Sequence, residues 1–394
     1  MLPRVGASRM MQPMSCWFEF VGNQTATAIA RCKAAMFRDC AWLLVLAGCV
    51  FLSGCANGSP DLGSVERTFT NPLLPRGADP WVFYKDGFYY YMHTTARNLT
   101  VWKTRSIADL RDAERKVVWQ PPASGPYSKD IWAPEIHFLR GKWYIYFAAD
   151  DGHNANHRTW VLENASPDPL QGEWQLKGKL TDATDRWAID ASVFENRGKL
   201  YVMWSGWEHD TNGVQNIYIA AMKNPWTIEG PRVRISTPEY AWEKFGALAP
   251  NPQTGDPAQV DVNEGPQMLK RGDKLLLVYS ASGCWTDNYC LGMLTANTGS
   301  NLLDPASWQK SPQPVLSSRP EAQAYAPGHC SFFKSPGGKE DWILFHANSE
   351  PGQGCGRFRS PRAQPISWKA NSTPDFGFPI PLATPIRRPS GEAR

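Results

Sequence analysis

The sequence has no large excess of charge of either sign and no long hydrophobic run. Its 394 residues carry 41 Lys and Arg against 37 Asp and Glu, a formal net charge of +4. Without a basic cluster, this balance argues against nucleic-acid binding. The longest apolar run, Ala41 to Leu52, has 12 residues, whereas about 20 are needed to span a bilayer. CxxC and HExxH motifs are absent, so a structural zinc site is not expected.

The apolar run is typical of an export signal. Arg31, Lys33 and Arg38 precede it, as in the charged region of a signal peptide, and it ends in the sequence LSGC at Cys55, which resembles a bacterial lipobox. We predict a leader over 1–54, with Met36 as an alternative start, lipidation of Cys55 and a flexible tether over 55–68. The protein would be exported and lipid-anchored at the bacterial cell envelope, in the periplasm or outer membrane, and would meet the membrane only through this anchor.

Few cysteines remain once the leader is set aside. Of the nine in the chain, four lie before Cys55 and four lie after it: Cys284, Cys290, Cys330 and Cys355. An exported protein can oxidise these four, which allow three connectivities. The short loop between Cys284 and Cys290 makes this pair the first expectation for a disulfide, and Cys330 with Cys355 the second.

The composition of the whole sequence predicts an ordered chain of many short elements. Aromatic residues make up 12% of the sequence and must pack in a core, while 33 Pro and 32 Gly imply frequent turns. Short alternating runs of aromatic and β-branched residues recur, each divided by a Gly turn. The five clearest, each expected to form a β-hairpin, are residues 81–92, 135–147, 192–204, 267–279 and 331–345.

The five hairpins predict an all-β fold, a five-bladed β-propeller. None of the units could bury both faces of its sheet alone, so they should pack around a common axis. We expect this catalytic domain to span 69–382, with a C-terminal tail over 383–394. Aligning the turn glycines and counting back eight residues places five residues at one shared position: Asp79, Ala133, Asp190, Glu264 and His329.

Three carboxylates and an imidazole at equivalent positions would converge at one mouth of the propeller channel. Two carboxyl groups flanking a glycosidic bond are the minimal apparatus for its hydrolysis. One must be protonated to assist the leaving oxygen, and the other ionised to activate water or attack carbon. A third carboxylate beside the acid can raise the pKa of that acid by charge repulsion. The alternative is that each Asp only caps a turn, as single Asp residues often do.

At these residues the sequence resembles glycoside hydrolase family 43. The resemblance runs from about Thr70 to Pro379 and implies inverting, five-bladed-propeller enzymes that act on arabinose- and xylose-containing polysaccharides. The segment ADPW implies Asp79 as general base, IDAS implies Asp190 as the residue that tunes and orients the acid, and NEGP implies Glu264 as general acid. The chemistry would require no cofactor.

The same resemblance implies further site residues. The segment PGH matches a central histidine, His329, often linked through water to a calcium or sodium ion in the channel, here followed by Cys330 where Asn is common. We expect Trp132, His329, Arg357 and Trp81 to bind substrate. The stretch 247–260 is expected to be an inserted loop at the rim of the pocket.

Three segments resemble the exo-acting α-L-arabinofuranosidase branch of the family: 127–137, 204–207 and 364–368. They favour release of terminal arabinofuranosyl residues from arabinan or arabinoxylan oligosaccharides. We separately expect a monomer. The alternatives are a β-xylosidase, an endo-1,5-α-L-arabinanase and a surface lipoprotein that binds pentose glycans without cleaving them.

Overall fold

The computed structural model describes residues 67–249 and 257–392. The predicted leader, its lipidation site Cys55 and the tether up to residue 66 lie outside the described residues. Within the described part of the chain, no helix is long and apolar enough to cross a membrane. Its helices are five short 3-10 turns: η1 (Ile107–Asp112), η2 (Asn154–Asn156), η3 (Ala241–Glu243), η4 (Pro305–Ser307) and η5 (Pro320–Ala322).

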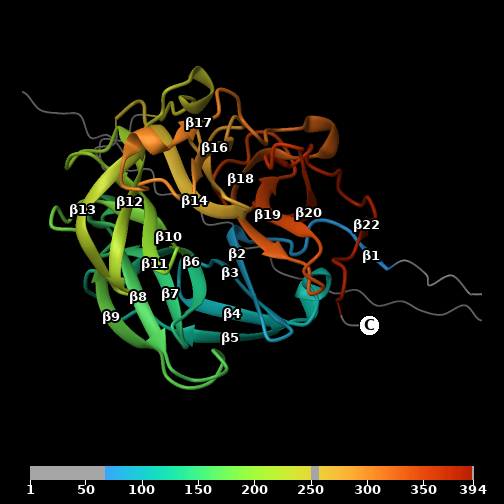
Figure 1. Ribbon diagram of the computed structural model, residues 1–394, viewed down its shortest axis with the longest axis horizontal. Helices are drawn as coiled ribbons and strands as arrows, with labels where there is room; N and C mark the ends of the chain where they lie inside the picture. Colours follow the sequence, from blue (N-terminus) through green and yellow to red (C-terminus); the bar gives the residue numbers. More distant parts are fainter. Residues whose placement is uncertain (1–66, 250–256, 393–394) are drawn as a thin grey trace, which may run out of the picture. The chain divides into compact units, whose positions relative to one another are not determined.

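The rest of the regular structure is β-strand, as predicted. Most strands form antiparallel groups of four that follow one another along the chain (Figure 1). The first two groups are β2 (Ala78–Lys85), β3 (Phe88–Thr94), β4 (Leu99–Thr104) and β5 (Glu114–Trp119), then β6 (Lys129–Leu139), β7 (Lys142–Asp150), β8 (Arg158–Asn164) and β9 (Gln175–Leu180).

The third group is β10 (Ala188–Asn196), β11 (Lys199–Trp207), β12 (Val214–Asn224) and β13 (Thr227–Ser236), and the fourth is β14 (Asp261–Arg271), β15 (Lys274–Ala281), β16 (Cys290–Asn297) and β17 (Gln309–Lys310). A short parallel pairing of β12 with β14 joins these two groups. The fifth group is β18 (Tyr325–Lys334), β19 (Asp341–Asn348), β20 (Ser360–Trp368) and β21 (Pro374–Asp375). A separate two-stranded ladder pairs β1 (Thr68–Phe69) with β22 (Ile386–Arg387).

Aromatic alternation along the strands explains how the groups pack. Successive side chains of a strand point to opposite faces of its sheet. Tyr89 and Tyr91 of β3 therefore pack into a core shared with Phe333 of the fifth group, whereas Tyr90 packs into a core shared with Trp143 of the second group. Each face of the first group is thus buried against a neighbouring group.

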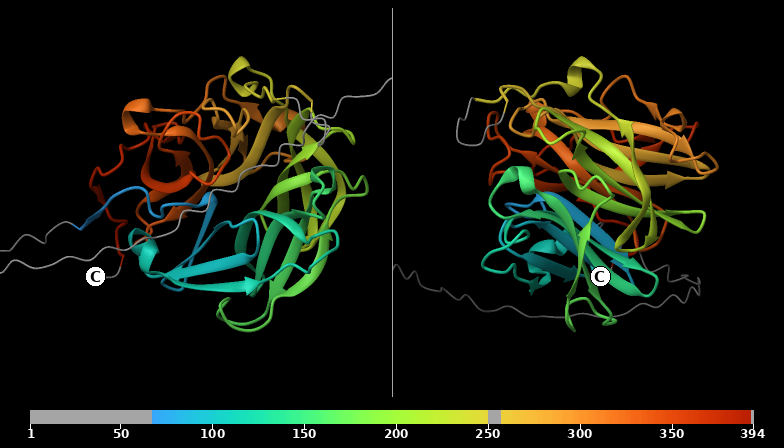
Figure 2. Two further views of the ribbon diagram at one scale, coloured as in Figure 1. Left: turned by 180° about the vertical axis from the view of Figure 1, so that it is seen from behind. Right: turned by 90° about the vertical axis from the view of Figure 1, so that its left-hand side faces the viewer.

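The first strands of the groups lie next to one another in a closed circuit. β2 contacts β6, β6 contacts β10, β10 contacts β14, β14 contacts β18, and β18 returns to β2. Figure 2 shows the same packed groups from behind and from the side. The circuit brings the starts of these five strands together around one centre, and the main cavity described below opens there.

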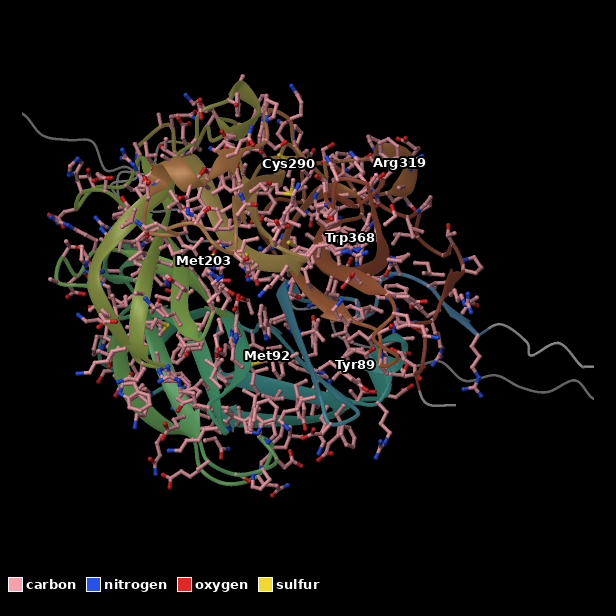
Figure 3. The ribbon with its side chains drawn as sticks, viewed as in Figure 1. Tyr89, Met92, Met203, Cys290, Arg319 and Trp368 are labelled. Carbon is pink, nitrogen blue, oxygen red and sulfur yellow. A yellow bond between two sulfur atoms is a disulfide. The ribbon has the colours of Figure 1, made fainter. Side chains whose placement is uncertain are left out.

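The disulfide differs from the prediction. Cys284 pairs with Cys355, 71 residues away, and Cys290 and Cys330 are free and buried. Cys290, labelled in Figure 3, lies on β16 and packs into a core with Leu277. The short spacing from Cys284 misled the prediction because strand β16 carries the second thiol into the interior, while Cys284 stays in the loop before it.

Candidate active site

A shared backbone feature positions the predicted residues. In each group the pairing of the first two strands is interrupted by a β-bulge near the start of the first strand. At one bulge of each group, one residue has a positive φ, between 42° and 58°: Asp79, Ala133, Asp190, Gly265 and His329. The second and fifth groups have a further bulge nearer the start of the strand, where Asp130 and Ala326 also have positive φ. Left-handed backbone costs a non-glycine residue about 1–2 kcal/mol, and such strain is concentrated at functional sites.

The bulges correct the predicted alignment by one residue. Four of the five predicted positions are confirmed as equivalent, but in the fourth group the equivalent residue is Gly265, and Glu264 lies one position earlier. The one-residue offset arises because the aligned glycine occupies a different position in the turn of the fourth hairpin. Gly87 is the second turn residue of its hairpin, whereas Gly272 is the first residue after β14. Glu264 therefore occupies the place that Ala78, Trp132 and Ile189 occupy in other groups.

Asp79 is held ionised by its neighbours. One carboxylate oxygen, Oδ1, accepts a hydrogen bond from Arg359 Nη1 at 2.9 Å and lies 3.4 Å from His329 Nδ1. The other oxygen accepts from Thr94 Oγ1 at 2.6 Å. Burial alone raises the pKa of Asp79, but the Arg359 guanidinium, the two neighbouring histidines and the Thr94 hydroxyl together lower it well below its usual range.

The pKa of Glu264 is shifted in the opposite direction, toward the protonated form. Its Oε1 accepts a hydrogen bond from the hydroxyl of the buried Tyr289 at 2.7 Å. Burial raises the pKa of Glu264 to about 7, although the Tyr289 hydrogen bond lowers it, and the negative charge of Asp79 adds to the increase. The site therefore contains one carboxyl group that is readily ionised and one that is readily protonated at near-neutral pH.

Asp190 is close enough to both carboxyl groups for their charges to act on it. Its Oδ2 accepts the N–H of Gly265 at 3.0 Å and lies 3.9 Å from His329 Nδ1. Burial raises the pKa of Asp190, and the charges of Glu264 and Asp79 raise it further. Because Asp190 and Glu264 influence each other, they titrate as a pair that retains a proton more readily than either carboxyl group would in water.

Two histidines complete the centre of the site. His329 donates its backbone N–H to Ser280 Oγ at 2.7 Å, and burial lowers its pKa. His346 of β19 accepts the backbone N–H of Asp79 on Nδ1 at 3.0 Å, and burial and the charge of Arg359 lower its pKa. The His346 ring also stacks on Tyr289, with the ring planes 1° from parallel and the centroids 5.8 Å apart.

A main cavity of about 760 Å³ opens beside these groups. The predicted Asp79, Asp190, Glu264, Trp132, His329 and Arg357 all border it. Trp132 stacks on His157, with ring centroids 4.0 Å apart. His157 therefore covers one face of the Trp132 indole ring and does not contact the other face. Arg357 lies over the ring of Phe358 at 5.1 Å from its centroid.

Trp81 does not border this cavity, so the structure does not bring it together with the other predicted substrate-binding residues, and its role in binding stays a prediction. Its indole N–H donates to the carbonyl oxygen of Ile136 at 2.7 Å, and its ring packs 4.6 Å from that of His137. Trp81 resumes the regular strand pairing after the bulge at Asp79. Its side chain therefore packs between the first and second groups.

Sequence reasoning missed several lining residues. Arg359, and not the predicted Arg357, contacts Asp79. The one sequence signal for Arg359 was its position two residues after Arg357. Trp187, whose ring stacks on that of Trp207 with centroids 4.7 Å apart, also borders the cavity. Trp285, whose place in a loop after a strand suggested contact with a sugar, borders it as well. A tryptophan ring is a suitable surface for a sugar ring, because one apolar face can pack on another.

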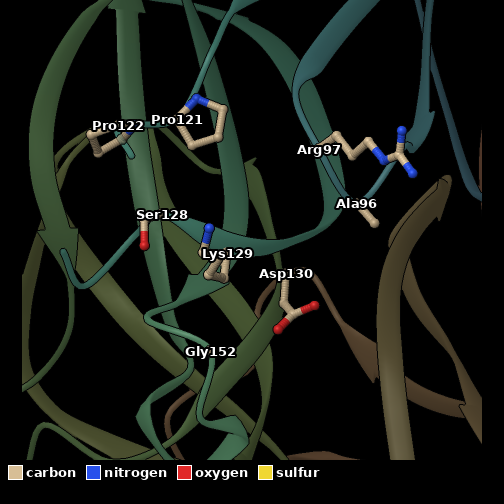
Figure 4. Close-up of a pocket in the computed structure, with 8 residues that line it drawn as sticks. All are labelled: Ala96, Arg97, Pro121, Pro122, Ser128, Lys129, Asp130 and Gly152. Carbon is tan, nitrogen blue, oxygen red and sulfur yellow. The ribbon is translucent and has the colours of Figure 1, made fainter. Parts of the chain in front are cut away.

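A smaller cavity of about 460 Å³ adjoins the main one and shares Ala96 with it. Figure 4 shows Arg97, Lys129 and Asp130 among its lining residues. Asp130 is the only carboxylate that borders it, so the paired carboxyl chemistry belongs to the main cavity.

The residues around His329 do not form a direct coordination shell for the expected channel ion. The described part of the chain contains no group of three or more His, Cys, Asp or Glu side chains that could hold a metal. His329 instead directs Nδ1 toward the carboxylates of Asp79 and Asp190. We therefore derive no chemical step from a calcium or sodium ion.

Comparison with known proteins identifies the family. The family model for glycosyl hydrolases family 43 matches residues 69–374. The chain belongs to glycosyl hydrolase family 43. It is thus a glycosidase, as the motifs around Asp79, Asp190 and Glu264 predicted.

Individual relatives agree with this assignment. An extracellular exo-α-(1→5)-L-arabinofuranosidase of Streptomyces chartreusis is 39% identical over 75% of this chain and 85% of its own length. An enzyme of the same name from Streptomyces avermitilis is 37% identical over 82% of this chain, which spans 66% of that relative. The crystal structure of an α-L-arabinofuranosidase from Lactobacillus brevis, 34% identical, superposes with a TM-score of 0.73 and covers 80% of this chain and 98% of its own.

Proposed function

We propose that this family 43 enzyme removes terminal α-L-arabinofuranosyl residues from arabinan or arabinoxylan oligosaccharides, with inversion at the anomeric carbon. The observation that carries the proposal is the pair Asp79 and Glu264 in one cavity with oppositely shifted pKa values. Such a pair supplies the ionised base and the protonated acid that glycoside hydrolysis needs. The arabinofuranosidase relatives support the choice of sugar.

In the proposed mechanism, Asp79 accepts a proton from water as that water attacks the anomeric carbon. Arg359, Thr94 and His329 surround the Asp79 carboxylate and hold it ionised and oriented. Glu264 donates its proton to the departing glycosidic oxygen, and Tyr289 orients the Glu264 carboxyl group. Asp190, through its mutual influence with Glu264, helps to keep a proton on that pair. Trp132 and Arg357 would contact the sugar.

We further propose that the five strand groups are the blades of a five-bladed β-propeller domain over 69–382. The closed circuit of contacts between the first strands of the groups supports it. Export fits the half-exposed disulfide, since such bonds persist in oxidising compartments. Lipid anchoring at Cys55, the monomeric state and an ion bound through water near His329 stay predictions.

A substrate panel tests the function. The protein, with the leader removed, should release arabinose from α-1,5-arabino-oligosaccharides and from an aryl α-L-arabinofuranoside. Xylose release or internal cleavage of arabinan would instead favour the β-xylosidase or endo-arabinanase alternatives. Saturable binding without turnover would favour the binding protein.

The residue roles and the stereochemistry have their own test. Asp79→Ala and Glu264→Ala should each lower kcat by orders of magnitude while circular dichroism and the melting temperature show a folded protein. Proton NMR of the first-formed sugar should show inversion. Activity that survives either substitution, or a retained configuration, would overturn the mechanism.

A further inference from the structure

The Cys284–Cys355 disulfide joins two loops that both border the main cavity. The first loop, residues 282–289, connects β15 to β16 and ends at Tyr289. The second, residues 349–359, connects β19 to β20 and ends at Arg359. The bond therefore crosslinks the fourth strand group to the fifth at the rim of the proposed active site.

Each loop carries one contact to a proposed catalytic carboxyl group. Tyr289 donates its hydroxyl to Glu264 at 2.7 Å, and Arg359 donates to Asp79 at 2.9 Å. Cys284 is five residues before Tyr289, and Cys355 is four residues before Arg359. The crosslink thus lies close in the chain to the groups that hold the acid and the base.

Other contacts across the two loops are few and exposed. The Asp287 carboxylate accepts the N–H of Gly352 at 3.0 Å near the surface. The indole N–H of Trp285 in the first loop does not reach the second loop, because it donates to the carbonyl oxygen of Ala247 in the predicted inserted loop. Exposed hydrogen bonds contribute little net stability, so the covalent bond is the strongest link between the two rim loops among the residues described.

We propose that the Cys284–Cys355 disulfide is a positioning crosslink that holds Tyr289 on Glu264 and Arg359 on Asp79, so that the enzyme is fully active only when this bond is oxidised. The inference rests on the proposed function. Both cysteines are half-exposed at the rim, where a small dithiol can reach them, whereas Cys290 and Cys330 are buried.

The relevant reaction is thiol–disulfide exchange. Dithiothreitol supplies two electrons and two protons, the S–S bond breaks to leave two thiols, and the reagent closes to its cyclic disulfide. Loosened loops would weaken both carboxyl contacts. A geometric error of about 1 Å can cost about 100-fold in rate, so we expect kcat to fall about 10- to 100-fold, with a smaller change in KM.

The pH profile provides a readout that mere destabilisation would not move. Glu264 is faced by Tyr289, Asp79, Asp190 and Arg359, and Asp79 by Arg359, His329, His346 and Glu264. Weakening the Tyr289 contact raises the pKa of Glu264, and weakening the Arg359 contact raises that of Asp79. Both limbs of the kcat/KM profile should therefore move to higher pH after reduction.

The experiment compares the oxidised wild type, the wild type reduced with dithiothreitol and the Cys284→Ser/Cys355→Ser variant, each folded at the assay temperature by circular dichroism. The reduced protein and the variant should share a lowered kcat and an upward-shifted profile, and reoxidation should restore the wild type alone. Dithiothreitol should not change the variant further.

The outcomes separate this inference from the proposed function. An unchanged profile in the reduced protein and the variant, or a further response of the variant to dithiothreitol, would overturn the role of the crosslink while leaving the glycosidase assignment intact. An oxidised wild type that releases no arabinose would instead overturn the proposed function.

Discussion

Asp79 and Glu264 illustrate how neighbours assign roles to chemically similar groups. Both carboxyl groups are drawn toward the neutral form by burial. Asp79 faces a guanidinium, two imidazoles and a hydroxyl, which outweigh burial, whereas the Tyr289 hydroxyl and the charge of Arg359 lower the pKa of Glu264 by less than burial raises it. Carboxyl groups whose surroundings push their pKa values apart are the expected signature of an acid–base pair.

The first prediction at the residue scale concerns pH. Activity requires ionised Asp79 and protonated Glu264, so kcat/KM should fall at low pH as Asp79 gains a proton and at high pH as the Glu264–Asp190 pair loses one. The basic limb should lie near 7, and the acidic limb should lie well below the usual range of a carboxyl group. A pH series of initial rates measures both limbs. A basic limb near the ordinary pKa of glutamate would contradict this assignment of the acid.

The second residue-scale prediction is that Tyr289→Phe moves the basic limb to higher pH. The substitution keeps the ring stacked on His346 but removes the hydroxyl whose hydrogen bond lowers the pKa of Glu264. We expect kcat to fall, with little change in KM, because the acid loses its orienting donor. The pH profile of the variant provides the measurement.

Tyr279→Phe is a matched control. Tyr279 is also buried, and its hydroxyl donates to a carboxylate, Glu243, at 2.8 Å. That carboxylate does not border the main cavity, so the pH profile should stay that of the wild type. An equal shift in both variants would indicate a general loss of stability instead of a specific effect on Glu264.

The side chains at the site were only partly predictable for a physical reason. Asp79, Asp190 and Glu264 sit in recognisable segments, and the structure places all three in one cavity. Arg359 escaped prediction because its contact with Asp79 joins residues 280 apart in sequence. The position of Trp81 outside the cavity was not predictable, because proximity in sequence to Asp79 does not reveal the face on which its side chain emerges after a bulge.

At the scale of elements, the hairpins were the most predictable feature. Alternating aromatic residues around a Gly turn specify two paired strands with both faces buried, and all five predicted hairpins form. Their exact alignment was less predictable, because Gly can occupy either position of a turn. The disulfide was not predictable from spacing, since the loops that carry Cys284 and Cys355 meet only when the fourth and fifth groups pack together.

The bulge in the fourth group gives a prediction at this scale. Gly265 has φ +55°, and a Cβ there would lie 3.2 Å from His329 Nδ1. Gly265→Ala should lower the unfolding free energy by about 1–2 kcal/mol from backbone strain alone. It should also lower kcat, because the His329 ring, whose Nδ1 lies 3.4 Å from Asp79, must shift to accommodate the Cβ. Denaturant titration and initial rates measure the two effects.

Gly272→Ala is a control that separates the cost of backbone strain from the effect of displacing His329. Gly272, at the turn of the same hairpin, has φ +57°, and a Cβ there would meet no atom of the neighbouring described chain within 4 Å. It should show a similar backbone cost with wild-type activity. Loss of activity in Gly272→Ala, or wild-type activity in Gly265→Ala, would contradict the proposed contact.

At the scale of the whole described domain, the beginning and the end of the described part of the chain meet. β1 pairs with β22, and the Asn71 side chain both donates to and accepts from the backbone of Ala363 in β20, at 3.0 and 2.9 Å. Near the other end, Arg388 binds Asp109 through two nitrogens. These contacts join the first and fifth groups, so the circuit of packed strands is closed by chain segments far apart in sequence.

This closure predicts the effect of removing residues 383–394. The truncation deletes β22, the Arg388–Asp109 pair and the Glu392 carboxylate that accepts the N–H of Ile107. Because each lost hydrogen bond contributes about 1 kcal/mol or less, the unfolding free energy should fall by on the order of 3 kcal/mol. Thermal melting and denaturant titration would measure the loss.

The same truncation should leave catalysis nearly unchanged well below the melting temperature. Ser390 contacts Ser335 and Gly337, at the turn between β18 and β19, whereas His329 lies near the start of β18, where the main cavity opens. The deleted segment therefore contacts the opposite end of the hairpin from the site. A large fall in kcat/KM with little loss of stability would show that the closure supports the active-site geometry directly. That result would contradict the prediction that residues 383–394 stabilise the fold without affecting catalysis.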